Sequence, residues 1–181
     1  SLHFLGPALL DFDVNARVPV RVGNRDPDCV PHGVYPAAGD DRWVAIAVEG
    51  DAAFAALCDA MDRPELARDA RFASPAARRA HEAALDDLVA AWTRTHEAVD
   101  VDRILQARGG AAGAVLDSAA LCADPQLRHR GHFLQIPHDE LGTTTIEGPR
   151  FRLSLTPPRV PEASPTYGRD TARVLGELLG Y

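Results

Sequence analysis

Residues that could bind a metal occur in two places, and neither place offers a full set of ligands. His129 and His132 lie three residues apart, which suits zinc, but no Cys or His at a suitable spacing supplies a third ligand. Asp11 and Asp13 form a carboxylate pair without further ligands, which is more typical of a solvated face or a helix cap. The sequence therefore predicts no metal site.

Nucleophilic catalysis also lacks a complete set of residues. Cys29, Cys58 and Cys122 are odd in number, lie far apart and have no evident partner base, so we expect reduced thiols. Asp40 and Asp41 adjoin in a turn-rich segment, where aspartate favours backbone hydrogen bonds. All 19 basic residues are arginine, which excludes Schiff-base and P-loop lysines. We therefore assign no catalytic residue within the chain.

Composition bounds the class of protein. The 181 residues, 46% hydrophobic and 25% charged, suffice for one sizeable core or for a compact domain with extensions. A net charge of −7 without a basic stripe argues against nucleic acid as a partner. No apolar run approaches a membrane span and no leader pattern is present, so we expect no membrane partner and a cytoplasmic location. Because Met61 is the only methionine, we expect processing or a longer natural protein.

A turn-rich loop that leads into a hairpin is the centre of the predicted fold. The loop covers residues 22–31 and contains two prolines. His32–Tyr35 is expected to be extended, and Pro36–Arg42 contains the glycine and aspartates of a chain reversal. Trp43–Val48 is apolar on both faces, which predicts a central strand.

Helical periodicity follows the hairpin. Asp51 is expected to cap a first helix, and a short turn follows at Pro64–Arg68. Ser74 should cap a long second helix, and Thr95 a third that ends at Gly109–Gly110. The buried stripes are expected to comprise Phe54, Leu57, Cys58 and Met61, then His81, Leu85, Leu88, Val89 and Trp92, then Val101, Ile104 and Leu105. The opposite, solvated side of the long helix is expected to carry Arg78, Arg79, Glu82, Asp86 and Asp87.

The remaining chain predicts further short elements and then an arm. They are a strand at Ala112–Leu116, a helical turn at Asp117–Ala123, a hairpin of His132–Ile136 with Thr143–Glu147, a strand at Arg150–Leu155, and a last helix at Asp170–Leu179. Prolines make residues 156–167 extended. The predicted fold class is α+β, with a small antiparallel sheet and packed helices, followed by an extended Pro-rich arm and a terminal helix.

Several motifs in succession resemble one protein family. They are Gly23-Asn24-Arg25-x-Pro27, Pro31-His32-Gly33-Val34-Tyr35-Pro36, Gly39-Asp40-Asp41-Arg42-Trp43-Val44, Pro64-Glu65-Leu66-Ala67, Asp124-Pro125-Gln126-Leu127, Arg130-Gly131-x-Phe133 and Gly148-Pro149-x-Phe151-Arg152. In this order the chain resembles the carboxy-terminal half of the family III CoA-transferases, the relatives of formyl-CoA, carnitine and bile-acid CoA-transferases and of 2-methylacyl-CoA racemases. Each motif alone is weak, but together they cover nearly the whole chain.

The resemblance implies that this chain contains only some of the domains of the full enzyme. In that family the catalytic aspartate lies in a larger amino-terminal domain that nothing here matches, and the full enzymes form interlocked homodimers. It therefore implies that residues 1–22 are a linker from that missing domain, 23–155 a small α+β domain, and 156–181 a Pro-rich arm and terminal helix. Because the family's carboxy terminus returns to the large domain, we expect the last helix to expose an apolar face or to find a substitute contact.

The resemblance also implies candidate substrate-binding residues. Family members place a loop over the acyl-CoA site here, some with consecutive glycines that this chain lacks. Asn24, Arg25, His32 and Gly33 are the candidates, because arginine and histidine can contact an acyl carboxylate or a CoA phosphate. The alternative is that Asn24 and Arg25 only hold the backbone of the loop.

The implied function is CoA transfer between an acyl-CoA thioester and a carboxylic acid, with coenzyme A as substrate and no separate cofactor. The chain would contribute to the acyl-CoA pocket but would be inactive by itself. The alternatives are a non-catalytic binding or assembly subunit that pairs with a separate catalytic chain, or part of an acyl-CoA racemase.

Overall fold

The computed structural model describes residues 3–18, 20–159 and 162–181, so parts of the predicted linker (1–2 and 19) and arm (160–161) lie outside the described residues. The chain divides into two compact units, residues 1–115 and 116–181. This division falls inside the predicted 23–155 domain, whose bounds remain a prediction. Each unit is described by itself.

A three-stranded antiparallel sheet is the centre of the first unit. Its strands are β1 (Cys29–Pro36), β2 (Trp43–Glu49) and β3 (Ala111–Ala114), in the order β1-β2-β3. Tyr35 pairs with Val44, and Val44 pairs with Ala114. The predicted hairpin and the central position of its second strand are therefore confirmed.

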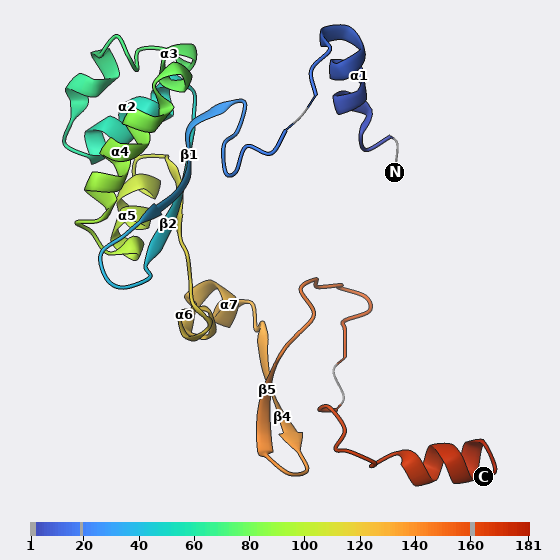
Figure 1. Ribbon diagram of the computed structural model, residues 1–181. Coiled ribbons are helices and arrows are strands. Elements are labelled where there is room, and N and C mark those ends of the chain that lie inside the picture. Colours follow the sequence, from blue (N-terminus) through green and yellow to red (C-terminus); the bar gives the residue numbers. More distant parts are fainter. Residues whose placement is uncertain (1–2, 19, 160–161) are drawn as a thin grey trace. The chain divides into compact units, whose positions relative to one another are not determined.

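Helices cover one face of this sheet (Figure 1). They are α2 (Gly50–Ala60), the 3₁₀ turn η1 (Pro64–Arg68), α3 (Pro75–Ala80), α4 (Glu82–Thr93) and α5 (Ala98–Gln106). Alternate residues of β2, Val44, Ile46 and Val48, are buried against them. The core on the helix side is completed by Phe54, Leu57, Phe72, Leu85, Val89, Val101 and Leu105. The predicted buried stripes thus supply most of the core.

The long predicted helix is instead two helices. α3 begins as expected, since Ser74 Oγ accepts the Ala77 N–H at 3.2 Å, but the chain breaks at His81, whose φ of −119° is not helical. His81 is exposed rather than part of the buried stripe. Arg78 and Glu82, predicted to face solvent, are buried instead. A pattern drawn on one straight helix misassigns faces on either side of such a break.

Three further predictions of local structure are wrong. Asp51 lies in the first turn of α2 and accepts from Arg78 instead of capping the helix. Thr95 donates to the Trp92 carbonyl at 2.7 Å, and α5 starts after Glu97. Residues 150–155 form no strand, because within the described residues no strand pairs with them.

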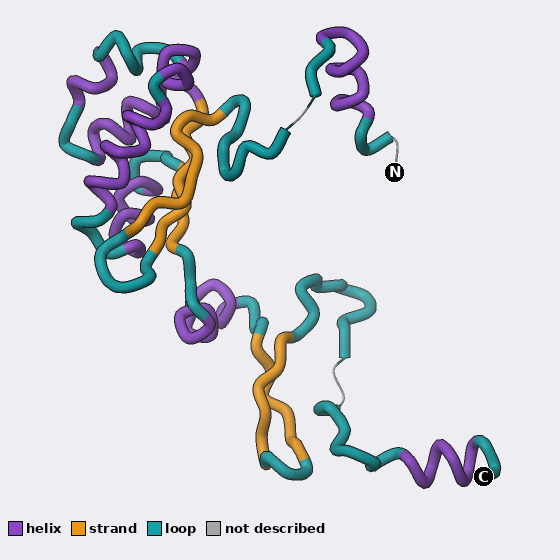
Figure 2. Tube along the Cα trace, in the orientation of Figure 1, coloured by secondary structure: helices purple, strands orange, loops and turns teal. Residues whose placement is uncertain are grey.

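The amino-terminal segment carries α1 (Gly6–Asn15), none of whose residues is buried. The second unit contains α6 (Ser118–Ala123), α7 (Pro125–His129), the hairpin of β4 (Phe133–His138) and β5 (Gly142–Glu147), and the π-helical η2 (Ala172–Leu178). Asp117 caps α6 as predicted, since it accepts the Ala120 N–H at 2.8 Å. Figure 2 shows residues 156–159 and 162–167 without helix or strand, as the prolines predict. The apolar residues of the last helix are exposed within this chain, as expected: Val174, Leu175, Leu178 and Leu179.

Candidate functional site

The loop before β1 is ordered by one aspartate. Asp26 Oδ1 accepts the backbone N–H of Asp28 at 2.8 Å and of Cys29 at 3.0 Å. These two donors hold the pKa of the Asp26 carboxyl below its usual range. An aspartate that bonds the backbone two and three residues ahead closes a tight turn, so the loop is shaped by its own residues.

Two residues of the helical layer fix the same loop to the unit. The Arg79 guanidinium donates to the Asp26 carbonyl at 3.0 Å and to the Pro27 carbonyl. Arg25 Nε lies 3.2 Å from Glu82 Oε2, and the Glu82 side chain is only 9% exposed. Because Glu82 is nearly buried, its charge is screened less by water than that of an exposed carboxylate. The candidate residue Arg25 is therefore engaged by an internal carboxylate.

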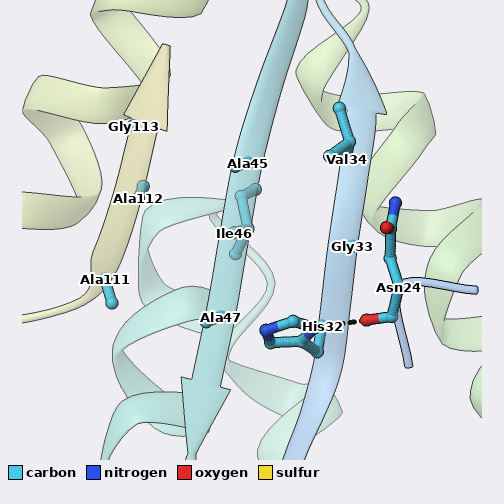
Figure 3. Close-up of a pocket in the computed structure, with 10 residues that line it drawn as sticks. All are labelled: Asn24, His32, Gly33, Val34, Ala45, Ile46, Ala47, Ala111, Ala112 and Gly113. Atoms are coloured by element: carbon cyan, nitrogen blue, oxygen red, sulfur yellow. Dashed lines mark hydrogen bonds between the residues drawn. The ribbon is translucent and has the colours of Figure 1, made fainter. Parts of the chain in front are cut away.

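A hollow of about 320 Å³ lies over the sheet face that the helices leave uncovered (Figure 3). The strand register explains its floor. His32 pairs with Ala47, Ala45 with Gly113, and Ala47 with Ala111. Since paired residues point to the same face, the small residues of β2 and β3 adjoin there, beside His32 of β1. The floor is therefore apolar and flat.

His32 is the titratable side chain that lines this hollow. Its Nδ1 bonds the backbone carbonyl of Asn24, as the dashed line in Figure 3 shows. A carbonyl oxygen can only accept, so Nδ1 carries the hydrogen, and in the neutral ring Nε2 is then an acceptor. Figure 3 shows the other ring nitrogen directed across the sheet towards Ala47 and Ala111.

Gly33 packs closely against the side chain of Tyr35. A Cβ at this position would lie 3.2 Å from the ring of Tyr35, which is buried and donates to Asp86 Oδ1 at 2.7 Å. Burial and the bond to Asp86 raise the pKa of the Tyr35 hydroxyl. The tyrosine is thus held in place, and any side chain at position 33 would crowd its ring.

The structure brings the four predicted site residues together. Asn24, His32 and Gly33 line the hollow. The same three residues and Arg25 line an adjoining hollow of about 460 Å³, which Asp86 and Asp87 of α4 also border. Sequence reasoning missed Arg79 and Glu82, which hold the loop, and the floor residues Ala45, Ala47, Ala111 and Gly113. The alternation of β2 could have placed Ala45 and Ala47 on one face, but nothing in the sequence links the loop to α3 and α4.

The other residues considered for chemistry make local contacts. Asp41 Oδ1 accepts the Trp43 indole N–H at 2.8 Å, Asp11 accepts from Asn15 at 2.7 Å, and His132 Nε2 lies 3.6 Å from Glu147. Across residues 3–18, 20–159 and 162–181, no three His, Cys, Asp or Glu side chains are grouped as metal ligands. Over the same ranges, no helix has the length and apolar character needed to cross a membrane.

Comparison with known proteins gives consistent matches. The model of CoA-transferase family III matches residues 1–171. The succinyl-CoA–D-citramalate CoA-transferase of Chloroflexus aurantiacus is 33% identical over 170 residues, which are 94% of this chain and 42% of the relative. The beta subunit of the succinyl-CoA–L-malate CoA-transferase of the same organism is 32% identical over 152 residues, covering 83% of this chain and 37% of the relative.

A solved structure is similar along almost the whole chain. The crystal structure of a CAIB/BAIF family protein from Brucella suis superposes with a TM-score of 0.79 at 27% identity, over 96% of this chain and 44% of that protein. The chain thus spans less than half the length of the relatives it matches. Since the family model covers nearly every residue and the predicted motifs fall within it, this chain belongs to CoA-transferase family III.

Proposed function

We propose that this chain is the carboxy-terminal part of an enzyme that transfers coenzyme A between an acyl-CoA thioester and a carboxylic acid. In this proposal the chain supplies one wall of the acyl-CoA pocket, and the catalytic aspartate lies in the part of the enzyme that this chain does not contain. The observation that carries the proposal is the open hollow that Asn24 of the loop and His32 of β1 border, in a chain of this family.

The chemistry of the hollow suits a short acyl or carboxylic acid group. Ligand pockets typically measure about 300–1,000 Å³, and this hollow of about 320 Å³ is at the small end. Its apolar floor can pack against methylene groups, while His32 and Asn24 offer polar contacts at one side. The adenine nucleotide of coenzyme A would have to bind outside this hollow.

The relatives suggest the class of acid. The names of both C. aurantiacus relatives specify succinyl-CoA with a second dicarboxylic acid, D-citramalate or L-malate. We propose succinyl-CoA as donor and a dicarboxylic acid as acceptor for the enzyme that contains this chain. Free acid and acyl-CoA are its substrates, and no further cofactor is proposed.

Assembly has two forms in this proposal. The catalytic domain is either attached in a longer chain, which would pair as a homodimer, or supplied by a separate subunit, because one relative is named as a beta subunit. We favour the longer chain, since all three matched proteins are more than twice as long as the aligned region. A cytoplasmic location is also proposed, since CoA thioesters are made and used there.

The test starts from the natural protein, captured from its own cells with an antibody raised against this chain. An immunoblot band above twice 19.4 kDa supports an attached catalytic domain, whereas a band at 19.4 kDa with a second, larger chain supports the assembly subunit. The captured protein is expected to transfer coenzyme A from succinyl-CoA to a dicarboxylic acid, and the 181-residue chain alone is not.

Racemase activity is the second outcome to be measured on the same sample. A racemase would exchange the α-hydrogen of a 2-methylacyl-CoA with deuterium from heavy water and would leave the thioester intact. Deuterium exchange without CoA transfer would overturn the proposed transferase function.

A further inference from the structure

We infer that Nε2 of His32 accepts a hydrogen bond from a hydroxyl group of the carboxylic acid substrate, so that the hollow prefers a hydroxy acid to the matching acid without the hydroxyl. This inference rests on the proposed function. It assigns a selecting residue and a substrate class to the hollow already described.

The first reason for this inference is the hydrogen bond at Nδ1 of His32. Asn24 presents a backbone carbonyl to Nδ1, and this partner cannot donate. Of the two neutral tautomers, the one with hydrogen on Nδ1 is therefore the one that fits this partner, and its Nε2 carries a lone pair. No described residue donates a hydrogen bond to Nε2, so the lone pair is available to a ligand donor.

The second reason is the set of groups that surround Nε2 of His32. Nε2 is directed over a floor of alanine and glycine, which offers a bound acid no competing side-chain acceptor there (Figure 3). Arg25 is paired with Glu82, so its guanidinium is already neutralised by a nearly buried carboxylate. The acidic residues Asp86 and Asp87 border the adjoining hollow rather than this one.

The third reason is that the loop that contacts His32 is anchored before a ligand binds. Asn24 directly precedes Arg25, which pairs with Glu82, and the turn of Asp26 that follows is held by Arg79. The carbonyl that fixes the His32 tautomer therefore adjoins anchored residues. A ring whose orientation is set before binding loses little rotational freedom when a ligand binds. A single acceptor can then discriminate between two acids of equal length and charge.

The experiment uses the full protein that contains this chain, with succinyl-CoA as donor. The two acceptors are 2-hydroxyglutarate, as separate enantiomers, and glutarate, which differ only by the hydroxyl group. His32→Ala is expected to lower kcat/KM for one enantiomer of 2-hydroxyglutarate about tenfold, the value of one hydrogen bond between neutral groups, and to change kcat/KM for glutarate less than about twofold.

His81→Ala is the matched control. His81 also bonds a backbone carbonyl through Nδ1, that of Ala77 at 3.0 Å, but it is exposed at the α3–α4 break and does not line the hollow. This control is expected to leave both acceptors unchanged. His32→Phe keeps a ring and removes both nitrogens, so it replaces His32→Ala if the alanine variant does not fold.

The outcomes separate the two proposals. Equal losses for both acids, or no loss for either, overturn the hydroxyl assignment while CoA transfer itself stands. If the unsubstituted protein transfers coenzyme A to neither acid, the proposed function fails, and this inference falls with it.

Discussion

Removal of the Asp51 carboxylate tests how the buried charge of Arg78 is stabilised. Arg78 is 2% exposed, and its Nη2 donates to Asp51 Oδ1 at 2.8 Å while Nη1 donates to the Phe72 carbonyl at 3.0 Å. Nε has no partner among the described residues, and the guanidinium lies 4.6 Å from the centre of the Phe54 ring. The charge therefore depends on a single carboxylate.

The expected cost follows from the unequal burial of the pair. Removing one partner of a fully buried ion pair costs about 3–5 kcal/mol. The Asp51 side chain is 70% exposed, so water weakens the pair, and we expect Asp51→Ala to lower the free energy of unfolding by about 2 kcal/mol. In an Arg78→Met background only the interaction of Asp51 with the first turn of α2 is lost, about 0.5 kcal/mol.

A double-mutant cycle measures the difference, an expected coupling energy of about 1.5 kcal/mol. Urea unfolding followed by tryptophan fluorescence suits the first unit, because both tryptophans, Trp43 and Trp92, lie within it. The matched control is Asp51→Asn, which removes the charge but keeps an oxygen acceptor, and it should fall between the wild type and Asp51→Ala. A coupling energy below about 0.5 kcal/mol would refute the dependence of Arg78 on Asp51.

Two further predictions concern glycine packing and thiol reactivity. Gly33→Ala is expected to lower the free energy of unfolding by about 1–3 kcal/mol, because its Cβ would crowd the buried Tyr35 ring, whereas Gly113→Ala, with open space at its Cβ, should be near neutral in the same urea assay. At pH 8, iodoacetamide should alkylate the exposed Cys122 well before Cys58, since burial raises the pKa of Cys58 to about 11 and the thiolate is the reactive form; equal rates by mass spectrometry would contradict this.

Local patterns of apolar residues predicted the helices and strands, but they did not predict correctly which side chains of each helix are buried. The apolar run Trp43–Val48 and the periodic residues from Phe54 onward gave the central strand and the core helices, because burial follows the strand and helix periods directly. The same reasoning failed for Arg78, because its guanidinium is buried over the Phe54 ring and donates to Asp51 and to the Phe72 carbonyl. Such burial depends on partners distant in sequence, which periodicity does not contain.

The candidate site shows a similar division. The resemblance offered Asn24, Arg25, His32 and Gly33 as candidates, and their role stays a prediction. The alanines on the floor of the hollow could not be predicted, because alanine is apolar on either face of a strand. β2 is central in the sheet, as predicted, yet Trp43 on its uncovered face remains 39% exposed. A strand with apolar residues on both faces thus need not be covered on both, and the difference between large and small apolar residues distinguishes the two faces of β2.

The loop itself bears on how the pocket works. Some relatives are expected to have consecutive glycines here, which would leave the loop free to close over a ligand. In this chain Asp26 bonds the backbone of its own turn, Arg79 donates to the carbonyls of Asp26 and Pro27, and Arg25 pairs with Glu82. The conformational entropy of these residues is therefore lost when the unit folds and not when a substrate binds. In the proposed enzyme, such a preformed wall would favour selection among small acids by fixed groups such as His32.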